Sequence, residues 1–252
     1  VEYGDENGTT EDDLRNAISD KTAAVHQVIY EQKPTDPNVL TLEQVIDITH
    51  AAGKPVSVDA AGQIYPLENF GKYVKMGADF QCIAAKYMGA PHSTGFALGT
   101  KEVIDAIGRH SFVGYEGRRI RGVGRPHKID RQEIMGVVAA VRRWVTLNHE
   151  DRLSSAEAQS QSILKPLMGL AGVTAELNTN IKGHQPFGVF VSVDPDVVGF
   201  TNEDLVTKLR DGEPSIWTRV SLDAPVLEIH VFGLGDGQAE LVGNAIADAV
   251  TR

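Results

Sequence analysis

The first 110 residues alternate between short apolar runs and longer segments that carry helical periodicity. The longer segments begin with a Thr cap or end with Gly, and their apolar residues recur every three or four positions. The predicted helices are residues 9–18, 41–53, 67–78 and 100–109. The predicted strands, which are apolar almost throughout, are residues 23–31, 54–62, 79–86 and 94–99. Strands of this kind, separated by helices, indicate a mostly parallel α/β sheet that is covered on both faces.

The rest of the chain follows a different pattern. Residues 111–129 are rich in Gly and Arg and are predicted to form a loop, after which we expect two long helices, 130–153 and 154–170. Further predicted elements are strands at 187–195, 215–222 and 226–232 and helices at 201–211 and 237–252. Several strands with helices on one side are typical of a small α+β domain.

Composition and charge limit the class of protein. The chain has 252 residues, 42% of them hydrophobic, and a formal net charge of −10. Its apolar runs are shorter than the roughly 20 residues of a membrane-spanning helix. Nucleic-acid binding is disfavoured, because phosphate binding needs clustered Lys and Arg and only residues 117–128 supply them. The single cysteine, Cys82, is predicted to be an inert core residue and indicates a reducing cytoplasm.

Two charged residues end apolar runs in the first part of the chain. Asp59 closes the run "VSVD" and Lys86 closes the run "FQCIAAK". Ligands of such sheets bind at the carboxyl ends of the strands, so both side chains are expected to face one crevice. An amine that binds an aldehyde and a carboxylate that keeps a pyridine nitrogen protonated are the two groups that pyridoxal phosphate requires. From spacing alone, an Asp–Lys ion pair or two solvated loop residues remain the alternatives.

Further stretches follow these residues in a fixed order. They are "VDAAGQ", "GADFQCIAAKYMGAPHSTGFALGTKEVIDA", "VGRPHKIDRQEIMGVVAAVRRW" and, near the C-terminus, "RDGEPSIWTR". In this order they resemble the selenocysteine synthase-like branch of the fold-type I pyridoxal phosphate enzymes. That branch includes seryl-tRNA selenium transferases and the D-glucosaminate-6-phosphate ammonia-lyase group. The resemblance runs along the whole chain and implies pyridoxal 5'-phosphate as the cofactor.

The resemblance also implies a domain organisation. Residues 1–130 would be part of an aspartate aminotransferase-like, cofactor-binding large domain. Residues 131–172 would be connecting helices, and residues 173–252 a small C-terminal α+β domain.

Carried over residue by residue, the resemblance assigns four residues near the cofactor ring. Asp59 would be the partner of the pyridinium nitrogen, and Lys86 would form the Schiff base with the cofactor. Ala61 would pack against one face of the ring, and a plain core alanine is the alternative. Gln63 would hydrogen-bond the ring hydroxyl or the substrate, or else cap the following helix.

Five more residues are candidates for binding anionic groups or substrate. Ser93 and Thr94 would contact the cofactor phosphate of a neighbouring subunit, although such hydroxyls often bond their own backbone. His92 stands where selenium transferases tend to have Gln, which places the substrate in question. Arg125 would bind an anionic end of substrate or cofactor, since guanidinium groups bind carboxylate and phosphate bidentately. Arg219 would bind the substrate α-carboxylate, with a surface strand residue as the alternative.

The resemblance leaves part of the cofactor pocket unassigned. Members of the family have a glycine-rich phosphate cup at a helix N-terminus and an aromatic residue stacked on the ring. Neither is recognisable before Val25, and we expect both on a preceding segment or on a second chain. Alone, the chain is expected to lack turnover. A homodimer or a higher even-numbered assembly is the expected oligomer.

The predicted function is that of a lyase that eliminates the β-substituent of a 2-amino acid or amino sugar acid, giving a 2-oxo acid and ammonia. One alternative is a selenium transferase-like enzyme that acts on aminoacyl-tRNA. A racemase or aldolase would use the same Asp59 and Lys86. An alternative of another class is a non-catalytic partner chain that lacks the phosphate cup. No metal site is predicted, because the histidines show no ligand spacing.

Overall fold

A computed structural model describes residues 1–29, 36–180, 185–221 and 224–251. The chain divides into two compact units, Val1–Thr146 and Leu147–Arg252. Each unit has its own sheet, and each is described by itself. No helix among the described residues is long and apolar enough to span a membrane.

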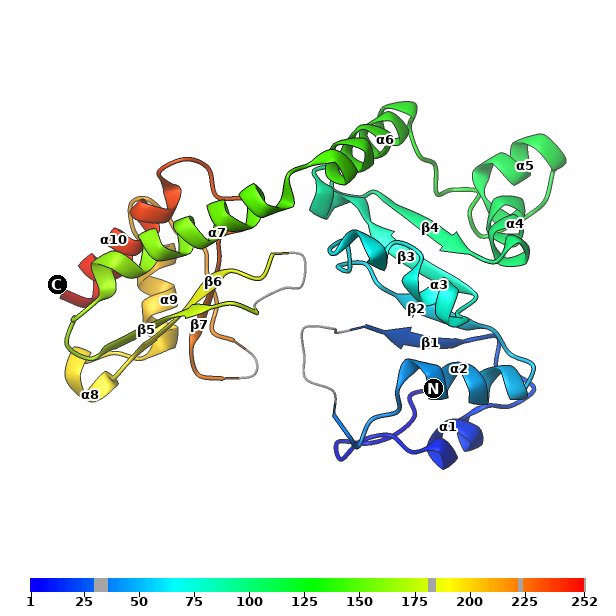
Figure 1. The fold of residues 1–252 in the computed structure, drawn as a ribbon, viewed down its shortest axis with the longest axis horizontal. Helices are drawn as coiled ribbons and strands as arrows, with labels where there is room; N and C mark the ends of the chain where they lie inside the picture. Colours follow the sequence, from blue (N-terminus) through cyan, green and yellow to red (C-terminus); the bar gives the residue numbers. More distant parts are fainter. Residues whose placement is uncertain (30–35, 181–184, 222–223, 252) are drawn as a thin grey trace. The chain divides into compact units, whose positions relative to one another are not determined.

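The first unit is built on a four-stranded sheet (Figure 1). Its order is β1 (Val25–Val28), β2 (Val56–Asp59), β3 (Phe80–Ala84) and β4 (Gly95–Gly99). The first three strands are parallel, and β4 runs antiparallel to β3. The predicted mostly parallel α/β sheet is therefore confirmed, with one antiparallel strand beside β3.

Six α-helices accompany this sheet among the described residues of the first unit. They are α1 (Glu11–Ala17), α2 (Leu42–Ala51), α3 (Lys72–Met76), α4 (Lys101–His110), α5 (Phe112–Arg118) and α6 (Arg131–Thr146). Two short 3-10 turns are η1 (Leu67–Asn69) and η2 (Ala85–Met88). The predicted Thr caps are confirmed, and Thr10 and Thr41 each form a capping box at α1 and α2.

The prediction of a loop over residues 111–129 is wrong at its start. The structure forms α5 there, because the Ser111 side chain accepts a hydrogen bond from the Gly114 N–H and caps the helix. The helix ends at Arg118, and the next residue, Arg119, caps it in the left-handed region with φ 57°. The residues after α5, from Arg119 on, form the part of the predicted loop that the structure confirms.

The predicted helix over residues 130–153 is broken in the structure. Helix α6 ends at Thr146, and α7 (His149–Leu164) begins after Asn148. The Asn148 side chain accepts hydrogen bonds from the Glu150 and Asp151 N–H groups, which starts a new helix. The last five residues of the predicted helix, 149–153, therefore belong to the start of α7.

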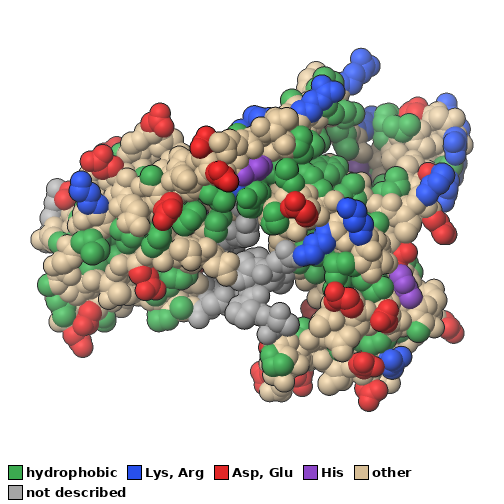
Figure 2. Space-filling model, in the orientation of Figure 1, with side chains coloured by type: hydrophobic (Ala, Val, Ile, Leu, Met, Phe, Trp, Pro, Cys, Tyr) green, Lys and Arg blue, Asp and Glu red, His purple; other side chains and the backbone are tan. Residues whose placement is uncertain are grey.

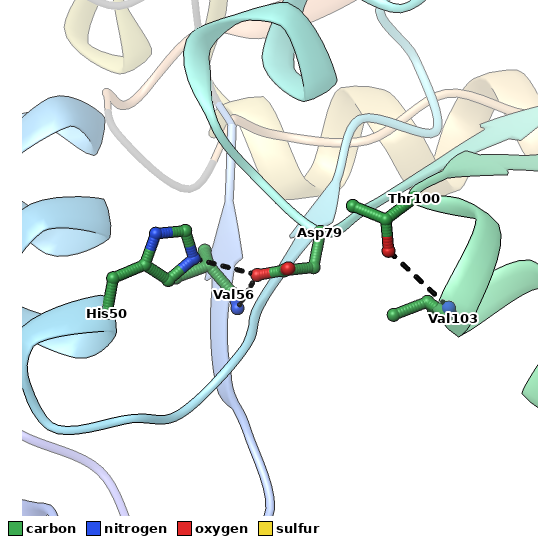
Figure 3. A network of polar contacts seen from close by, with 5 residues as sticks. All are labelled: His50, Val56, Asp79, Thr100 and Val103. Atoms are coloured by element: carbon green, nitrogen blue, oxygen red, sulfur yellow. Dashed lines mark hydrogen bonds and ion pairs between the residues drawn. The ribbon is translucent and has the colours of Figure 1, made fainter.

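Polar contacts of Asp79 fix the amino-terminal edge of the first sheet (Figure 3). Its Oδ2 accepts from the Val56 N–H at 2.8 Å and lies 2.9 Å from His50 Nε2. Its carbonyl accepts from the Thr100 N–H at 3.0 Å, and the Thr100 side chain caps α4. One residue thus holds the starts of β2, β3 and α4 together, at the opposite end of β2 from Asp59.

The second unit contains a three-stranded antiparallel sheet, β5 (Val173–Asn178), β6 (Gly188–Val193) and β7 (Leu227–His230). Its other elements are η3 (Lys165–Leu167), α8 (Pro195–Val198), α9 (Asn202–Arg210) and α10 (Gln238–Thr251). Side chains from these elements and from α7 form one core, which includes Ile163, Val191, Leu205, Leu227 and Ile246. The predicted α+β character of this region is confirmed.

The strand predicted at 215–222 does not form over residues 215–221, the part that the structure describes. The Ile216 N–H donates to the Leu209 carbonyl at the end of α9, so the backbone there follows the helix end instead of a neighbouring strand. Pairing with β7 is limited to an isolated bridge between Val220 and Leu227. In contrast, β5 forms although the sequence pattern did not predict it.

Candidate active site

Asp59 is the last residue of β2, and one of its two carboxylate oxygens accepts hydrogen bonds within the first unit. Its Oδ1 accepts a hydrogen bond from the Ala61 N–H at 2.9 Å and another from the Cys82 thiol at 3.5 Å. Among the described residues, Oδ2 has no hydrogen-bond or ion-pair partner. One oxygen is thus fixed, and the other is available to a donor that is not part of the described chain.

Lys86 lies in η2, directly after β3. Because β2 and β3 are parallel neighbours, Asp59 and Lys86 lie at the same edge of the sheet. Lys86 is half-buried, and its Nζ lies 5.2 Å from the centroid of the Tyr87 ring. Within the described ranges no ion pair joins Lys86 to a carboxylate, so the ion pair with Asp59 considered from the sequence does not form.

Ala61 and Gln63 lie in the loop that follows Asp59. The Ala61 carbonyl accepts from the Ala84 N–H at 3.0 Å and ties this loop to the end of β3. Gln63 is 5% exposed, and its Nε2 lies 3.4 Å from the Ile29 carbonyl, which follows β1. Both residues therefore lie at the edge of the sheet that carries Asp59 and Lys86.

The turn after Lys86 contains His92, Ser93 and Thr94. The Thr94 hydroxyl donates to the Pro91 carbonyl at 2.7 Å, and the Ser93 hydroxyl donates to Glu133 Oε1 of α6 at 3.2 Å. His92 is exposed. In this chain by itself, both hydroxyls bond groups of their own unit.

Arg125 follows α5 in a basic part of the first unit. Figure 2 shows Lys and Arg side chains over the α4 to α6 part of that unit. The Arg125 guanidinium lies 3.6 Å from Glu116 and 4.5 Å from the centroid of the Tyr115 ring. The Arg125 side chain thus lies between an acid and an aromatic ring of α5.

Arg219 belongs to the second unit. It is exposed and lines a cavity of about 610 Å³ together with Trp217, Glu228 and His230. The structure thus brings Asp59, Ala61, Gln63 and Lys86 together within the first unit, while Arg219 is held by the other unit.

Cys82 is less buried in the structure than the sequence predicts. It is only partly buried, and it pairs in register with Asp59 on the adjacent strand. The register of β2 and β3 places the Cys82 thiol beside the Asp59 carboxylate. A single sequence does not show that register, so the contact could not be predicted. The predicted core position is therefore wrong, while the predicted low reactivity of the thiol stays a prediction.

The thiol of Cys82 offers a direct probe of Asp59. Burial raises its pKa above the ordinary value, and the neighbouring Asp59 charge raises it further. Both effects favour the neutral thiol, so Asp59→Asn is expected to lower this pKa and speed alkylation by iodoacetamide at about pH 8. Because Cys82 is the one cysteine of the chain, the rate reports a single site. Asp47→Asn, an exposed change on α2, should leave the rate unchanged.

No protein-family model matches the chain, but curated relatives do. It is 27% identical over 245 residues to a 5'-C-glycyluridine monooxygenase-decarboxylase of a Streptomyces species. It is 26% identical over 244 residues to the D-glucosaminate-6-phosphate ammonia lyase of Salmonella typhimurium. Each alignment covers 96% of this chain but 58% and 61% of the relatives, so the chain spans about three fifths of their length.

Solved structures are also similar to this chain. A D-glucosaminate-6-phosphate ammonia-lyase matches with a TM-score of 0.75 at 25% identity, covering 100% of this chain and 64% of that one. A serine palmitoyltransferase of S. paucimobilis with bound pyridoxal phosphate–myriocin matches with a TM-score of 0.51 at 16% identity, covering 95% and 58% of the two chains, a likeness of fold alone. The chain therefore has the fold of the fold-type I pyridoxal phosphate enzymes and is related to a D-glucosaminate-6-phosphate ammonia-lyase.

Proposed function

We propose that the chain carries the lysine and the ring-nitrogen acid of a pyridoxal phosphate-dependent lyase. The reaction would eliminate the β-substituent of a 2-amino acid or amino sugar acid and release ammonia and a 2-oxo acid. The observation that carries this proposal is the pair at the ends of β2 and β3. Among the described residues, hydrogen bonds to Oδ1 orient the Asp59 carboxylate and Oδ2 has no partner, while no carboxylate binds Lys86.

These two residues fit the two ends of the cofactor. Bound pyridoxal phosphate supplies an aldehyde that bonds an amine and a protonated ring that stabilises negative charge at Cα. Asp59 Oδ2 would accept the hydrogen bond of the ring nitrogen and hold its proton there. The fixed Oδ1 lets the carboxylate do so without first losing rotational freedom.

Lys86 would have two roles, as the amine that binds the cofactor and as a general base. Its amine would bond the aldehyde and, once displaced by substrate, would remove the proton from Cα as a general base. A half-buried amine that no carboxylate of the described residues binds is free to reach an aldehyde at this edge of the sheet.

The remaining candidates would hold the cofactor and substrate. Ala61 and Gln63 would contact the ring, and Ser93 and Thr94 would exchange their present bonds for the phosphate of a neighbouring subunit's cofactor in a homodimer or higher even-numbered assembly. His92, Arg125 and Arg219 are proposed to bind substrate, the two arginines at anionic groups.

A second reaction has a specific observation in its favour. The monooxygenase-decarboxylase relative is as similar to this chain as the ammonia lyase is. Loss of the α-carboxylate uses the same ring-nitrogen acid and lysine as elimination. Decarboxylation is therefore the second candidate.

Product analysis separates the two reactions. The whole protein, with any partner chain that co-purifies, would be incubated with pyridoxal phosphate and 2-amino acids that carry a hydroxyl at C3, with and without a phosphate. Elimination releases ammonia and a 2-oxo acid in equal amounts. Carbon dioxide without ammonia would establish the second candidate instead, and turnover of none of these substrates would contradict both.

A further inference from the structure

Helix α6 contacts both loops that carry the proposed catalytic pair. The loop after β2 follows Asp59 and contains Ile64, and the turn after β3 contains Lys86 and runs to Thr94. Four residues of α6 reach these segments within the first unit: Glu133, Gly136, Arg143 and Trp144.

The N-terminal half of α6 lies against the far end of the Lys86 turn. Glu133 accepts the hydrogen bond from the Ser93 hydroxyl. A Cβ on Gly136 would lie 2.7 Å from Pro91 Cδ, so only glycine permits this close approach of the helix to the turn. Positions 133, 136, 140, 143 and 144 share one helix face, which includes the buried Ala140 and Trp144.

Trp144 holds the loop that follows Asp59. Its Nε1–H donates to the Ile64 carbonyl at 2.8 Å, and the two residues are 2% and 0% exposed. Because the bond is buried, loss of the donor would leave the carbonyl without a partner.

Arg143 holds the turn that contains Lys86. Its Nη2 donates to the Met88 carbonyl at 3.2 Å, two residues after Lys86. A Cβ on the next residue, Gly89, would lie 3.5 Å from the same Nη2, so the guanidinium sits directly against the turn. The donor is charged, which strengthens the bond.

We propose that Arg143 and Trp144 are positioning residues that fix the Asp59 loop and the Lys86 turn relative to each other. They are consecutive residues of one helix, so a single backbone segment sets both positions. This inference rests on the proposed function, in which Asp59 and Lys86 bind opposite ends of a rigid ring. A shift of one loop relative to the other would then slow the formation of the bond between Lys86 and the aldehyde.

Four variants of the whole protein test the proposal. Arg143→Met and Trp144→Phe remove the donors and keep much of the side-chain volume, while Arg143→Lys keeps a charged donor. Arg142→Met is the matched control, because Arg142 is exposed on the same helix and its side chain has no partner among the described residues. The first readout is hydrogen–deuterium exchange in peptides covering residues 60–64 and 86–90. The second is the rate at which pyridoxal phosphate is trapped on Lys86 by borohydride, measured well below the unfolding temperature of each variant.

The proposal predicts a matching pattern in both readouts. Arg143→Met should raise exchange at 86–90 and Trp144→Phe at 60–64, and both should slow trapping about tenfold, in line with the loss of one hydrogen bond. Arg143→Lys should restore most of the rate, and Arg142→Met should match the wild type. A residue that only stabilises the fold would lower the unfolding temperature and leave the trapping rate unchanged.

The experiment distinguishes failure of the positioning role of α6 from failure of the proposed function. If exchange and trapping in Arg143→Met and Trp144→Phe equal those of Arg142→Met, α6 does not position the two loops. If exchange rises as expected but the wild type is never trapped at Lys86, the positioning of the loops stands and the proposed function fails.

Discussion

Replacement of Lys86 by alanine is expected to reduce turnover by about 10⁴-fold or more, because one side chain supplies both the covalent link and the general base. Lys86→Arg should be equally inactive, since a guanidinium keeps the positive charge but is not deprotonated in a protein. Initial rates of ammonia release, with carbon dioxide followed in parallel, measure the effect.

A matched lysine serves as the control. Lys75 is exposed on α3 and has no ion-pair partner among the described residues, so Lys75→Ala should leave the rate unchanged. If Lys86→Ala kept more than about a tenth of wild-type turnover, a loss of only ~1.4 kcal/mol, covalent catalysis by this residue would be ruled out.

Asp59→Asn is expected to slow turnover by about 10²- to 10³-fold, the range seen when one preorganised electrostatic contact to developing charge is removed. The amide cannot keep the ring nitrogen protonated, so the ring loses its capacity to stabilise negative charge at Cα. Lys86 is untouched, and the borohydride-trapped adduct should therefore still form. The same variant should show the faster Cys82 alkylation described above, which checks that the charge beside the thiol is gone.

The effect should be specific to this carboxylate. Asp47→Asn removes an exposed acid from α2 and should change neither turnover nor trapping. If Asp59→Asn turned over at the wild-type rate, Asp59 would not be the partner of the ring nitrogen.

The sequence predicted those parts of the fold that depend on local pattern. Apolar runs bounded by capped helices predicted β2 and β3. The charged residues that close these runs, Asp59 at the end of β2 and Lys86 in η2 directly after β3, were thereby placed at one edge of the sheet. Parallel pairing then follows from the intervening helix, so the location of the pair needed no information about distant contacts.

Other features depend on contacts that a single sequence does not encode locally. The thiol of Cys82 meets Asp59 only through the register of β2 and β3. Trp144 reaches Ile64 across 80 positions of sequence, and no periodicity predicts such a bond. The end of α6 was missed because Asn148, a good cap, is preceded by a continuous helical pattern.

Reduction by borohydride followed by peptide mapping tests the central claim most directly. The whole protein would be incubated with pyridoxal phosphate, reduced, digested and analysed by mass spectrometry. One adduct is expected, on Lys86, and its formation should be prevented by Lys86→Ala but not by Lys75→Ala. An adduct on any other lysine, or none at all, would contradict the assignment of Lys86 and the function proposed from it.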